Sequence, residues 1–273
     1  MTQTSRHFGD YDVLLLLDGE FEAPVDVLIH AEGETARQHA IDAWGLPRLK
    51  VDVNCFLLRG PNGITLVDAG TGTGWGPAFG HARTALLDAG IVPEQVDRVL
   101  LTHLHGDHML GLLDDKAAFL PRAEILVPQA DLAAFTDPSA RAVAPEARRS
   151  AFDNVERLVG AYGGRLRGFG DDAPLRGIEA LPLWGHSPGH TGYLLHDATT
   201  PLLLWGDTLH VSALQPADPE IGLAFDMDPA AAVRTRRATL ERAAEAGWIV
   251  AGGHITGFNR VQRAQPGFSL MPA

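Results

Sequence analysis

The segment with the clearest chemical potential is Thr102–His108, where four side chains able to bind a metal ion fall within six residues. His103 and His105 are two positions apart, so in an extended chain both imidazoles project to the same side and can hold one cation. Asp107 and His108 are adjacent and must diverge, and the glycine before them permits a sharp turn toward a second cation. The spacing therefore predicts a site for two metal ions.

The donor types favour zinc. Imidazoles with a minority of carboxylates suit Zn²⁺ among the common metals, and Fe²⁺ or Mn²⁺ accept the same donors. A single histidine is more often a surface or structural residue, but four potential ligands in one short segment change that balance. Packing three imidazoles and a carboxylate together without a cation would cost about 1–3 kcal/mol for each buried group left unpaired. We therefore interpret the segment as a metal site.

The pattern His-x-His-x-Asp-His resembles the hallmark of the metallo-β-lactamase fold superfamily. Four further residues resemble the other metal-site motifs of that family: Asp68 in ITLVDAG, His190 in SPGHT, Asp207 in LWGDT and His254 in AGGH. The resemblance spans Asp52 to His254. It implies a four-layer αββα sandwich and two divalent cations.

The resemblance also implies a role for each of these motif residues. The first cation would be held by His103, His105 and His190, the second by Asp107, His108 and His254, with Asp207 bridging the two. Asp68 would accept a hydrogen bond from a ligand imidazole, although an aspartate before Ala-Gly is also a common turn residue. His186 is expected to shape the loop of His190. His210 occupies a position where several lactone-cleaving relatives place a substrate-contacting tyrosine, so we expect it to face the substrate.

Two cations that share one water favour hydrolysis, in which a bridging hydroxide attacks a carbonyl carbon or phosphorus. Asp107 is expected to relay the proton, and this mechanism needs no serine or cysteine nucleophile. The stretches Leu204–Gln215 and Asp226–Pro229 resemble the branch that contains N-acyl homoserine lactonases and methyl parathion hydrolase. We therefore expect a lactonase or esterase. A phosphotriesterase is the alternative, and a non-catalytic metal-binding protein is the third reading.

The substrate is expected to be a small, neutral and partly apolar molecule. Several apolar residues in loop-like sequence are candidates for its pocket, with ordinary packing as the alternative for each. They are Trp44, Trp75, Phe79, Leu214, Phe225 and Met227. Cys55 lies mid-strand and away from the cluster, so we expect a small buried side chain rather than a ligand.

The elements that must position these residues alternate between strands and helices. Predicted strands are 11–18, 52–59, 63–68, 98–102, 124–127, 165–169, 178–184, 191–196, 202–205 and 248–251, and predicted helices are 78–89, 129–135, 145–163 and 229–245. Surface loops are expected at 137–139 and 170–174. This alternation predicts an α/β fold of two packed mixed sheets with outer helices. We expect one domain over residues 1–273, with an N-terminal strand and loop segment (1–50), a core (51–254) and a C-terminal tail (255–273).

Composition limits the partners. Twenty-two basic against 34 acidic residues give a formal charge of −12, which disfavours nucleic acid because phosphate binding relies on Lys and Arg. The longest uncharged apolar run, Val13–Leu17, is far shorter than the ~20 residues of a membrane helix, so no membrane partner is expected. A lone cysteine suits a reducing compartment, and the cytoplasm is the expected location. Apolar residues such as Val25 and Leu28 could serve a homodimer contact or the core.

Overall fold

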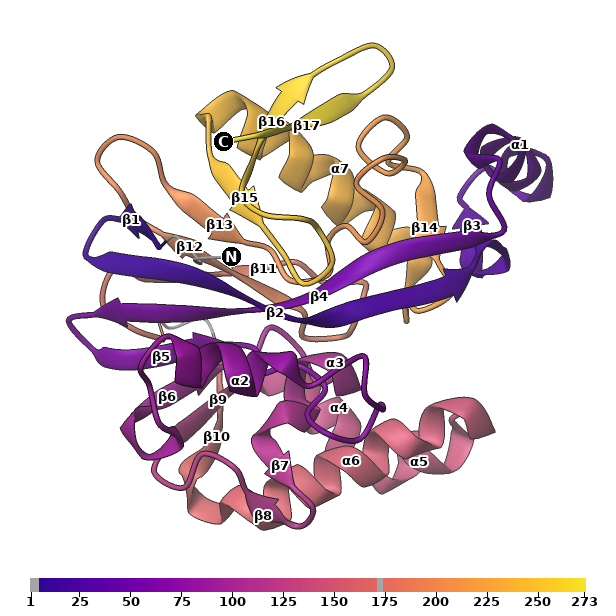
Figure 1. The fold of residues 1–273 in the computed structure, drawn as a ribbon. Coiled ribbons are helices and arrows are strands. Elements are labelled where there is room, and N and C mark those ends of the chain that lie inside the picture. The colour runs from indigo at the N-terminus through magenta and orange to yellow at the C-terminus, as the bar shows by residue number, and fades with distance from the viewer. Residues whose placement is uncertain (1–4, 171–173) are drawn as a thin grey trace.

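The computed structural model describes residues 5–170 and 174–273, so three residues of the predicted loop 170–174 lie outside it (Figure 1). Two sheets form its centre. In order across the first sheet the strands are β1 (Arg6–Phe8), β2 (Tyr11–Pro24), β4 (Arg48–Gly60), β5 (Gly63–Val67), β6 (Arg98–Leu100), β9 (Glu124–Pro128) and β10 (Leu166–Phe169). The strands β5, β6, β9 and β10 run parallel, and the others pair antiparallel, so the sheet is mixed.

The second sheet is also mixed. Its strands, in order, are β11 (Ile178–Pro182), β12 (Thr191–Leu195), β13 (Leu202–Leu204), β15 (Ile249–Ala251), β16 (Asn259–Arg263) and β17 (Phe268–Pro272). Only the β13–β15 pair in this sheet is parallel. Two small pairs complete the strands: β3 (Leu28–His30) with β14 (Ile221–Leu223), and β7 (Leu113–Asp114) with β8 (Ala117–Ala118).

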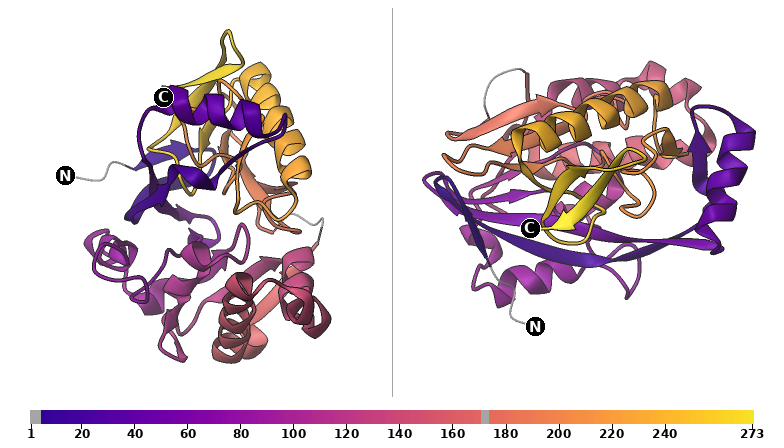
Figure 2. Two further views of the ribbon diagram at one scale, coloured as in Figure 1. Left: turned by 90° about the vertical axis from the view of Figure 1, so that its right-hand side faces the viewer. Right: turned by 90° about the horizontal axis from the view of Figure 1, so that it is seen from above.

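Seven α-helices accompany these strands within the described residues. They are α1 (Glu34–Trp44), α2 (His81–Asp88), α3 (Gly106–Met109), α4 (Gln129–Thr136), α5 (Pro138–Val143), α6 (Glu146–Tyr162) and α7 (Pro229–Ala246). Short 3₁₀ turns cover Val25–Val27, Pro93–Gln95, Leu110–Leu112 and Gly163–Arg165. Helices α2, α3, α4 and α6 lie on the outer side of the first sheet, and α7 lies on the outer side of the second (Figures 1 and 2).

Side-chain alternation along the strands explains the layers. In β5, Val67 packs between the two sheets and Leu66 packs under the helices of the first sheet. In β13, Leu204 packs between the sheets and Leu203 packs toward α7. Because successive side chains of a strand point to opposite faces, an uninterrupted apolar strand is stable only when both faces are covered. The predicted αββα sandwich is confirmed.

Several elements differ from the sequence prediction. Helix α1 lies in the segment expected to hold only strands and loops, and α5 begins in the loop expected at 137–139. Asp137 caps α5 by accepting a hydrogen bond from the backbone N–H of Ser139, so a turn-type residue here starts a helix. The expected C-terminal tail contains β16 and β17, which extend the second sheet beside β15.

The strands β2 and β4 are longer than predicted because they continue past the first sheet as a two-stranded arm (Figures 1 and 2). The far end of this arm packs against β3, α1 and β14 in a separate apolar cluster around Leu28, Leu49 and Ile221. Leu28 is therefore buried in the molecule itself. The arm matters for function because its inner side borders the cavity described below.

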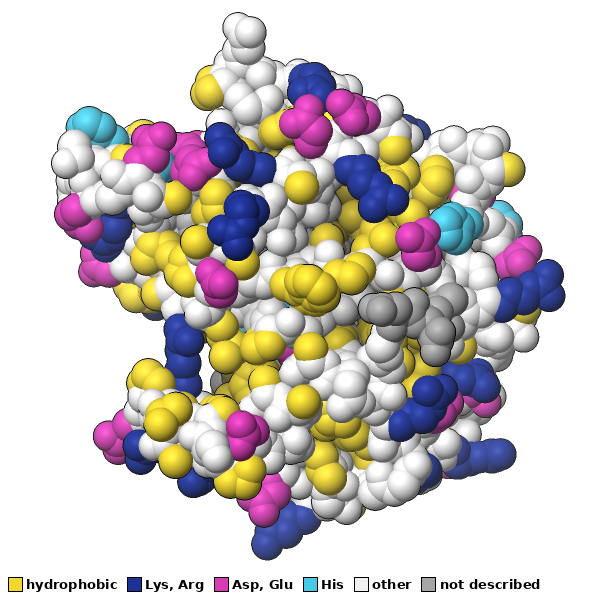
Figure 3. Space-filling view, turned by 180° about the vertical axis from the view of Figure 1, so that it is seen from behind, with side chains coloured by type: hydrophobic (Ala, Val, Ile, Leu, Met, Phe, Trp, Pro, Cys, Tyr) yellow, Lys and Arg dark blue, Asp and Glu magenta, His cyan; other side chains and the backbone are white. Residues whose placement is uncertain are grey.

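Charged side chains of both signs lie side by side on the outer surface, as the rear face in Figure 3 shows. Arg141, for example, lies 2.7 Å from Asp153, and both side chains are about half exposed. Exposed pairs of this kind contribute roughly 0–1 kcal/mol each. The apolar layers, rather than surface pairs, account for the stability of this fold.

Among the described helices, none is long and apolar enough to cross a membrane.

Candidate metal centre

The candidate ligands all follow strand ends at one edge of the sandwich. Asp68 follows β5, the segment His103–His108 follows β6, Asp207 follows β13, and His254 follows β15. Within each sheet, β5 with β6 and β13 with β15 are parallel pairs, so their carboxyl ends meet at the same edge. Residues that are far apart in the sequence are therefore brought to one place by topology.

The structure brings the donor atoms into three overlapping groups, each with its atoms within 4.8 Å of one another. The first group is His103, His105 and His186, the second is Asp107, His108, Asp207 and His254, and the third is His186, Asp207 and His210. The groups adjoin, since the rings of His103 and His108 are only 4.1 Å apart between centroids. Two cations can therefore be held side by side.

Asp207 lies at the centre of the cluster. Its Oδ2 is 3.0 Å from Nε2 of His254, 3.2 Å from Nε2 of His186 and 3.3 Å from Nε2 of His210. Its Oδ1 lies 3.2 Å from Nε2 of His108. The carboxylate is 2% exposed, so a single buried anion faces donors of all three groups.

Three imidazoles are oriented by partners on the ring nitrogen that faces away from the centre. Nδ1 of His254 donates to the backbone oxygen of Asp52 (2.7 Å), and Nδ1 of His103 lies 3.0 Å from Oγ1 of Thr102. Nδ1 of His108 donates to Oδ2 of Asp68 (2.8 Å). Such partners fix the tautomer and leave Nε2 free to bind a cation. Asp68 thus lies behind the imidazole of His108, and its role beside a metal ligand remains a prediction.

Asp68 adopts a left-handed backbone conformation with φ of 59°. Its Oδ1 also accepts the backbone N–H of Thr102 at 2.8 Å. A positive φ is uncommon for a residue with a side chain, and aspartate is among the few types that tolerate it. The conformation aims the carboxylate at both Thr102 and His108, which ties β5 to the histidine segment.

His190 is close to the cluster but does not contribute a donor atom to it. Its Nδ1 donates to the backbone oxygen of Leu183 at 2.7 Å, and its Nε2 accepts the backbone N–H of Asp207 at 2.9 Å. Both ring nitrogens are therefore occupied by main-chain groups. The predicted ligand role of His190 is not what the structure shows, because this imidazole holds the backbone of Asp207 instead.

The neighbouring His186 takes the place that we assigned to His190. Nε2 of His186 lies 2.9 Å from Nδ1 of His105, and its Nδ1 lies 2.9 Å from Oδ1 of Asp226. The sequence analysis treated His186 only as a loop residue. The segment His-Ser-Pro-Gly-His offers two histidines four positions apart, and nothing in the spacing chooses between them.

The histidines of the cluster differ in the direction of their pKa shifts. Burial, with a contribution from neighbouring imidazoles, holds the pKa of His103 and His105 well below its usual range. For His186, burial lowers the pKa, but hydrogen bonds and charges of Asp207 and Asp226 outweigh it and raise the pKa to about 9. Neutral imidazoles bind cations directly, whereas a protonated one must first lose its proton.

Gly253 shows why small residues surround the site. A Cβ built at this position would lie 2.6 Å from Oδ1 of Asp207 and 2.7 Å from Cε1 of His108. Only a glycine lets the backbone pass this close to Asp207 and His108.

The sequence model of the metallo-beta-lactamase superfamily matches residues 48–254. The chain belongs to this superfamily. Among solved structures, the hydrolase AbOPH of the beta-lactamase superfamily is 25% identical, with a TM-score of 0.88 over 99% of this chain and 97% of that one. AidC, described as a dizinc quorum-quenching lactonase in complex with an N-acyl-homoserine product, has the same TM-score at 20% identity, covering 99% of this chain and 97% of AidC. The uncharacterised YobT of Bacillus subtilis is 26% identical over 174 residues, which is 63% of this chain and 69% of YobT.

The superfamily implies divalent metal ions, and the residues of this chain fit them. Nε2 of His103, Nε2 of His108 and Oδ1 of Asp207 are buried and make no well-directed hydrogen bond within the described residues, although the last two atoms lie 3.2 Å apart. Buried polar atoms are normally satisfied, and each exception needs an explanation. Imidazoles and carboxylates that converge without partners are the donor set expected for Zn²⁺ or a related cation. A metal centre explains all three atoms.

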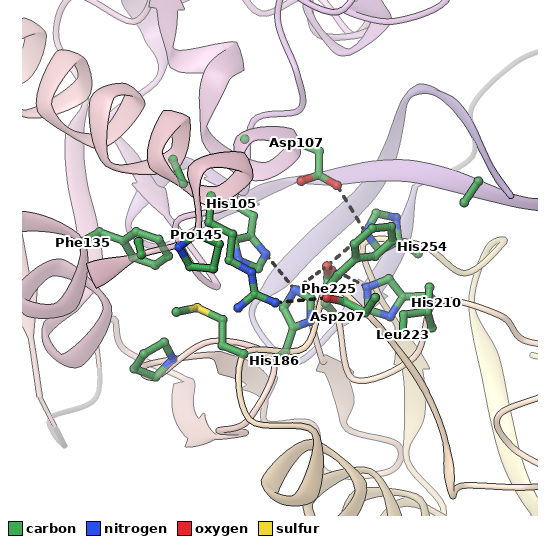
Figure 4. A pocket seen from close by; sticks show the side chains of 18 of the residues that line it. His105, Asp107, Phe135, Pro145, His186, Asp207, His210, Leu223, Phe225 and His254 are labelled. Carbon is green, nitrogen blue, oxygen red and sulfur yellow. Dashed lines mark hydrogen bonds and ion pairs between the residues drawn. The ribbon is translucent and has the colours of Figure 1, made fainter. Parts of the chain in front are cut away.

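A cavity of about 730 Å³ opens onto this metallo-β-lactamase centre (Figure 4). His105, Asp107, His186, Asp207, His210 and His254 lie at one end of it. The remaining walls are mostly apolar and come from the β2–β4 arm, from α4 to α6, and from the loop after β14. Its size is typical of a site for a small organic molecule.

Half of the predicted pocket residues border this cavity. Trp75, Phe225 and Met227 lie in its wall. Phe79 instead packs edge-on against Trp75, with ring centroids 5.6 Å apart. Trp44 and Leu214 pack against the apolar cluster at the far end of the arm. The prediction for these three is corrected, because apolar residues in loop-like sequence also serve local packing.

Proposed function

We propose that this protein is a dinuclear-metal hydrolase that cleaves a lactone or an ester, with N-acyl homoserine lactones as the leading substrates. The observation that carries the proposal is the meeting of buried metal donors with the end of a large, mostly apolar cavity. A neutral and partly apolar molecule can fill the walls while presenting a polar bond to the donors. The other lining side chains away from the centre include one cation, Arg148, which donates to the backbone oxygen of Ala224 at 3.1 Å.

The residues that would hold the two cations differ from the predicted set at one position. His103, His105 and His186 would hold the first, Asp107, His108 and His254 the second, and Asp207 would contact both. When bound, such cations supply water that is activated for attack near neutral pH and polarise the substrate carbonyl. In this scheme Asp68 keeps His108 in the tautomer that exposes Nε2.

Asp107 is suited to move a proton. Both Asp107 and Asp207 border the cavity, but the Asp107 side chain is partly exposed whereas Asp207 is buried. Oδ2 of Asp107 faces His254 at 3.4 Å, which leaves Oδ1 able to accept a proton from the attacking water and return it to the departing alkoxide. A carboxylate within reach of both groups is the requirement for this role.

His210 is placed to contact the substrate. It borders the cavity and stacks on His254, with ring centroids 4.7 Å apart. Burial lowers its pKa to about 4, and its hydrogen bond to the carboxylate of Asp207 only partly opposes this. The imidazole is therefore neutral at pH 7, and a neutral imidazole donates one N–H. Because Asp207 would contact both cations, its Oδ2 would no longer hold the N–H of His210, and we assign that N–H to the carbonyl oxygen of the substrate.

The apolar walls favour an acyl chain over a polar one. Phe135 and Phe152 line the side formed by α4 and α6, and Phe21 and Val51 line the side formed by the arm. AidC, which shares this fold, is described with a bound N-acyl-homoserine product, which supports testing that class first. Each methylene that leaves water for such a wall contributes about 0.8 kcal/mol, so affinity should rise with chain length.

Phosphotriester hydrolysis is the second candidate, since a phosphotriester is also neutral and the resemblance of Leu204–Gln215 to methyl parathion hydrolase favours it. The test measures kcat/KM of zinc-loaded protein on N-acyl homoserine lactones of graded chain length and on methyl paraoxon. We expect the lactones to be cleaved and the longer acyl chains to be preferred. Activity on methyl paraoxon alone would replace the first candidate by the second.

A passive metal carrier is the remaining alternative, and it predicts tight zinc binding with no hydrolysis of any substrate in this panel. The cytoplasmic location and the homodimer remain predictions from the sequence. Size-exclusion chromatography with light scattering tests the dimer.

A further inference from the structure

A buried chain of three side chains leads from α7 to the metal centre. Oδ1 of Asp226 lies 2.9 Å from Nδ1 of His186, and Oδ2 of Asp226 lies 3.4 Å from Nη2 of Arg236. The three residues are at most 3% exposed. Asp226 and Arg236 lie outside the set of residues that would bind the cations, so the metal site by itself does not account for them.

Arg236 is fixed from several directions. Its Nε donates to the backbone oxygen of Thr208 at 3.0 Å, and its Nη1 donates to the backbone oxygen of Pro219 at 3.0 Å. Thr208 directly follows Asp207, so the same guanidinium contacts the loop of the central carboxylate and the partner of His186. Burying a guanidinium is costly unless each of its donors is used. The fork geometry of arginine meets that requirement here.

Asp226 determines which nitrogen of His186 is available. A carboxylate can only accept, so the proton of the neutral imidazole must sit on Nδ1, and Nε2 keeps its lone pair. Nε2 is the atom that faces Asp207 at 3.2 Å. Without Asp226, the ring could rotate or carry its proton on the wrong nitrogen.

We propose that Asp226 and Arg236 are positioning residues for the metal centre, in which Asp226 fixes the tautomer and direction of His186 and Arg236 fixes Asp226. This inference rests on the proposed function, because it takes His186 as a ligand. It predicts that Asp226 and Arg236 affect one cation more than the other, since His108 and His254 are oriented by Asp68 and by the backbone of Asp52 instead.

The test is Asp226→Asn, a substitution that preserves shape. The Arg236 guanidinium attracts the amide oxygen of the new side chain, which turns the amide N–H₂ toward His186 and forces the proton onto Nε2. Asp228→Asn is a matched control in the same loop, because Asp228 caps α7 through the backbone N–H of Ala231 and makes no side-chain bond to His186. Both variants receive the same isosteric change.

Zinc content after dialysis and zinc affinity by chelator competition are the readouts, with the cobalt-substituted absorption spectrum as a third. We expect Asp226→Asn to lower the affinity for one of the two zinc ions about 10- to 100-fold, the usual cost of losing the outer partner of a ligand. Asp228→Asn should change neither zinc affinity by more than about threefold. Equal zinc affinities in the two variants would overturn the proposal, because a merely structural role of the loop affects both alike.

Arg236→Lys provides a second measurement if Asp226→Asn does not fold. The lysine keeps the charge but cannot reach Asp226, Thr208 and Pro219 together, so the same zinc ion should bind more weakly, and unchanged binding would count against Arg236. A failure of the proposed function is recognised separately. In that case the wild-type protein itself binds fewer than two zinc ions, or His186→Ala leaves zinc binding unchanged.

Discussion

The assignment of His186 rather than His190 to the first cation gives the sharpest prediction, because the two residues are four positions apart and can be compared directly. His186→Ala removes one of the three imidazoles in the first group. Losing only the outer partner of a ligand weakens metal binding about 10- to 100-fold, so loss of the ligand itself should cost at least about 100-fold. We expect the variant to retain one zinc ion after dialysis and to lose hydrolysis.

His190→Ala should act on stability instead. It leaves the backbone N–H of Asp207 and the backbone oxygen of Leu183 unpaired in the interior. At about 1–3 kcal/mol for each unpaired buried group, the free energy of unfolding falls by about 2–6 kcal/mol. A change of 1 kcal/mol in the free energy of unfolding shifts Tm by about 2–4 °C in a chain near this length. The Tm of the metal-free variant should therefore lie about 4–24 °C below that of the metal-free wild type.

The assay pairs zinc content by mass spectrometry with thermal unfolding of both variants in metal-free and zinc-loaded form. At saturating zinc, His190→Ala should still hold two ions while it remains folded. The assignment is refuted if His190→Ala loses one zinc ion and His186→Ala keeps both. In that result the resemblance would have chosen the correct histidine and the geometry of His186 would need another explanation.

The remaining predictions concern charge and substrate contact. Asp207→Asn should lower the affinity of both cations and abolish hydrolysis, because its carboxylate faces donors of both groups; zinc titration and turnover measured together check this, and full activity would contradict it. His210→Ala should leave two zinc ions bound and lower kcat by about 100-fold or more, the usual loss when one donor to a developing oxyanion is removed; a drop in zinc content would contradict a substrate-facing role. Zinc uptake at pH 7 should release protons, because carboxylates raise the pKa of His186 to about 9 and that of His108 well above its usual range despite the opposing effect of burial. Zinc affinity should therefore rise with pH from 6 to 9, and calorimetry in buffers of different ionisation enthalpy measures the released protons.

Much of the architecture could be predicted from residue patterns. Strand β13 is an uninterrupted apolar run, and β5 is interrupted only by Thr65 after its first glycine; that pattern indicates a sheet covered on both faces. Helix α6 was predicted because its buried side chains recur near 3.6 residues. Helix α1 was missed because none of its residues is buried, so it lacks the apolar periodicity on which such predictions depend. The C-terminal hairpin was missed because β16 is mostly polar and both of its strands are partly exposed.

For the metal centre, the sequence alone was enough to identify the histidine-rich segment after β6 as a metal site. Its predicted ligands are neighbours in sequence, so local geometry suffices to bring them together. The sequence also placed Asp68, Asp207 and His254 at strand ends, which parallel pairing then gathers at one edge. The choice between His186 and His190 was left to the tertiary structure. Both histidines sit on one loop, and only the positions of Asp226 and of the Asp207 backbone determine which imidazole has a free Nε2. Those partners come from distant segments, so no local pattern could record the choice.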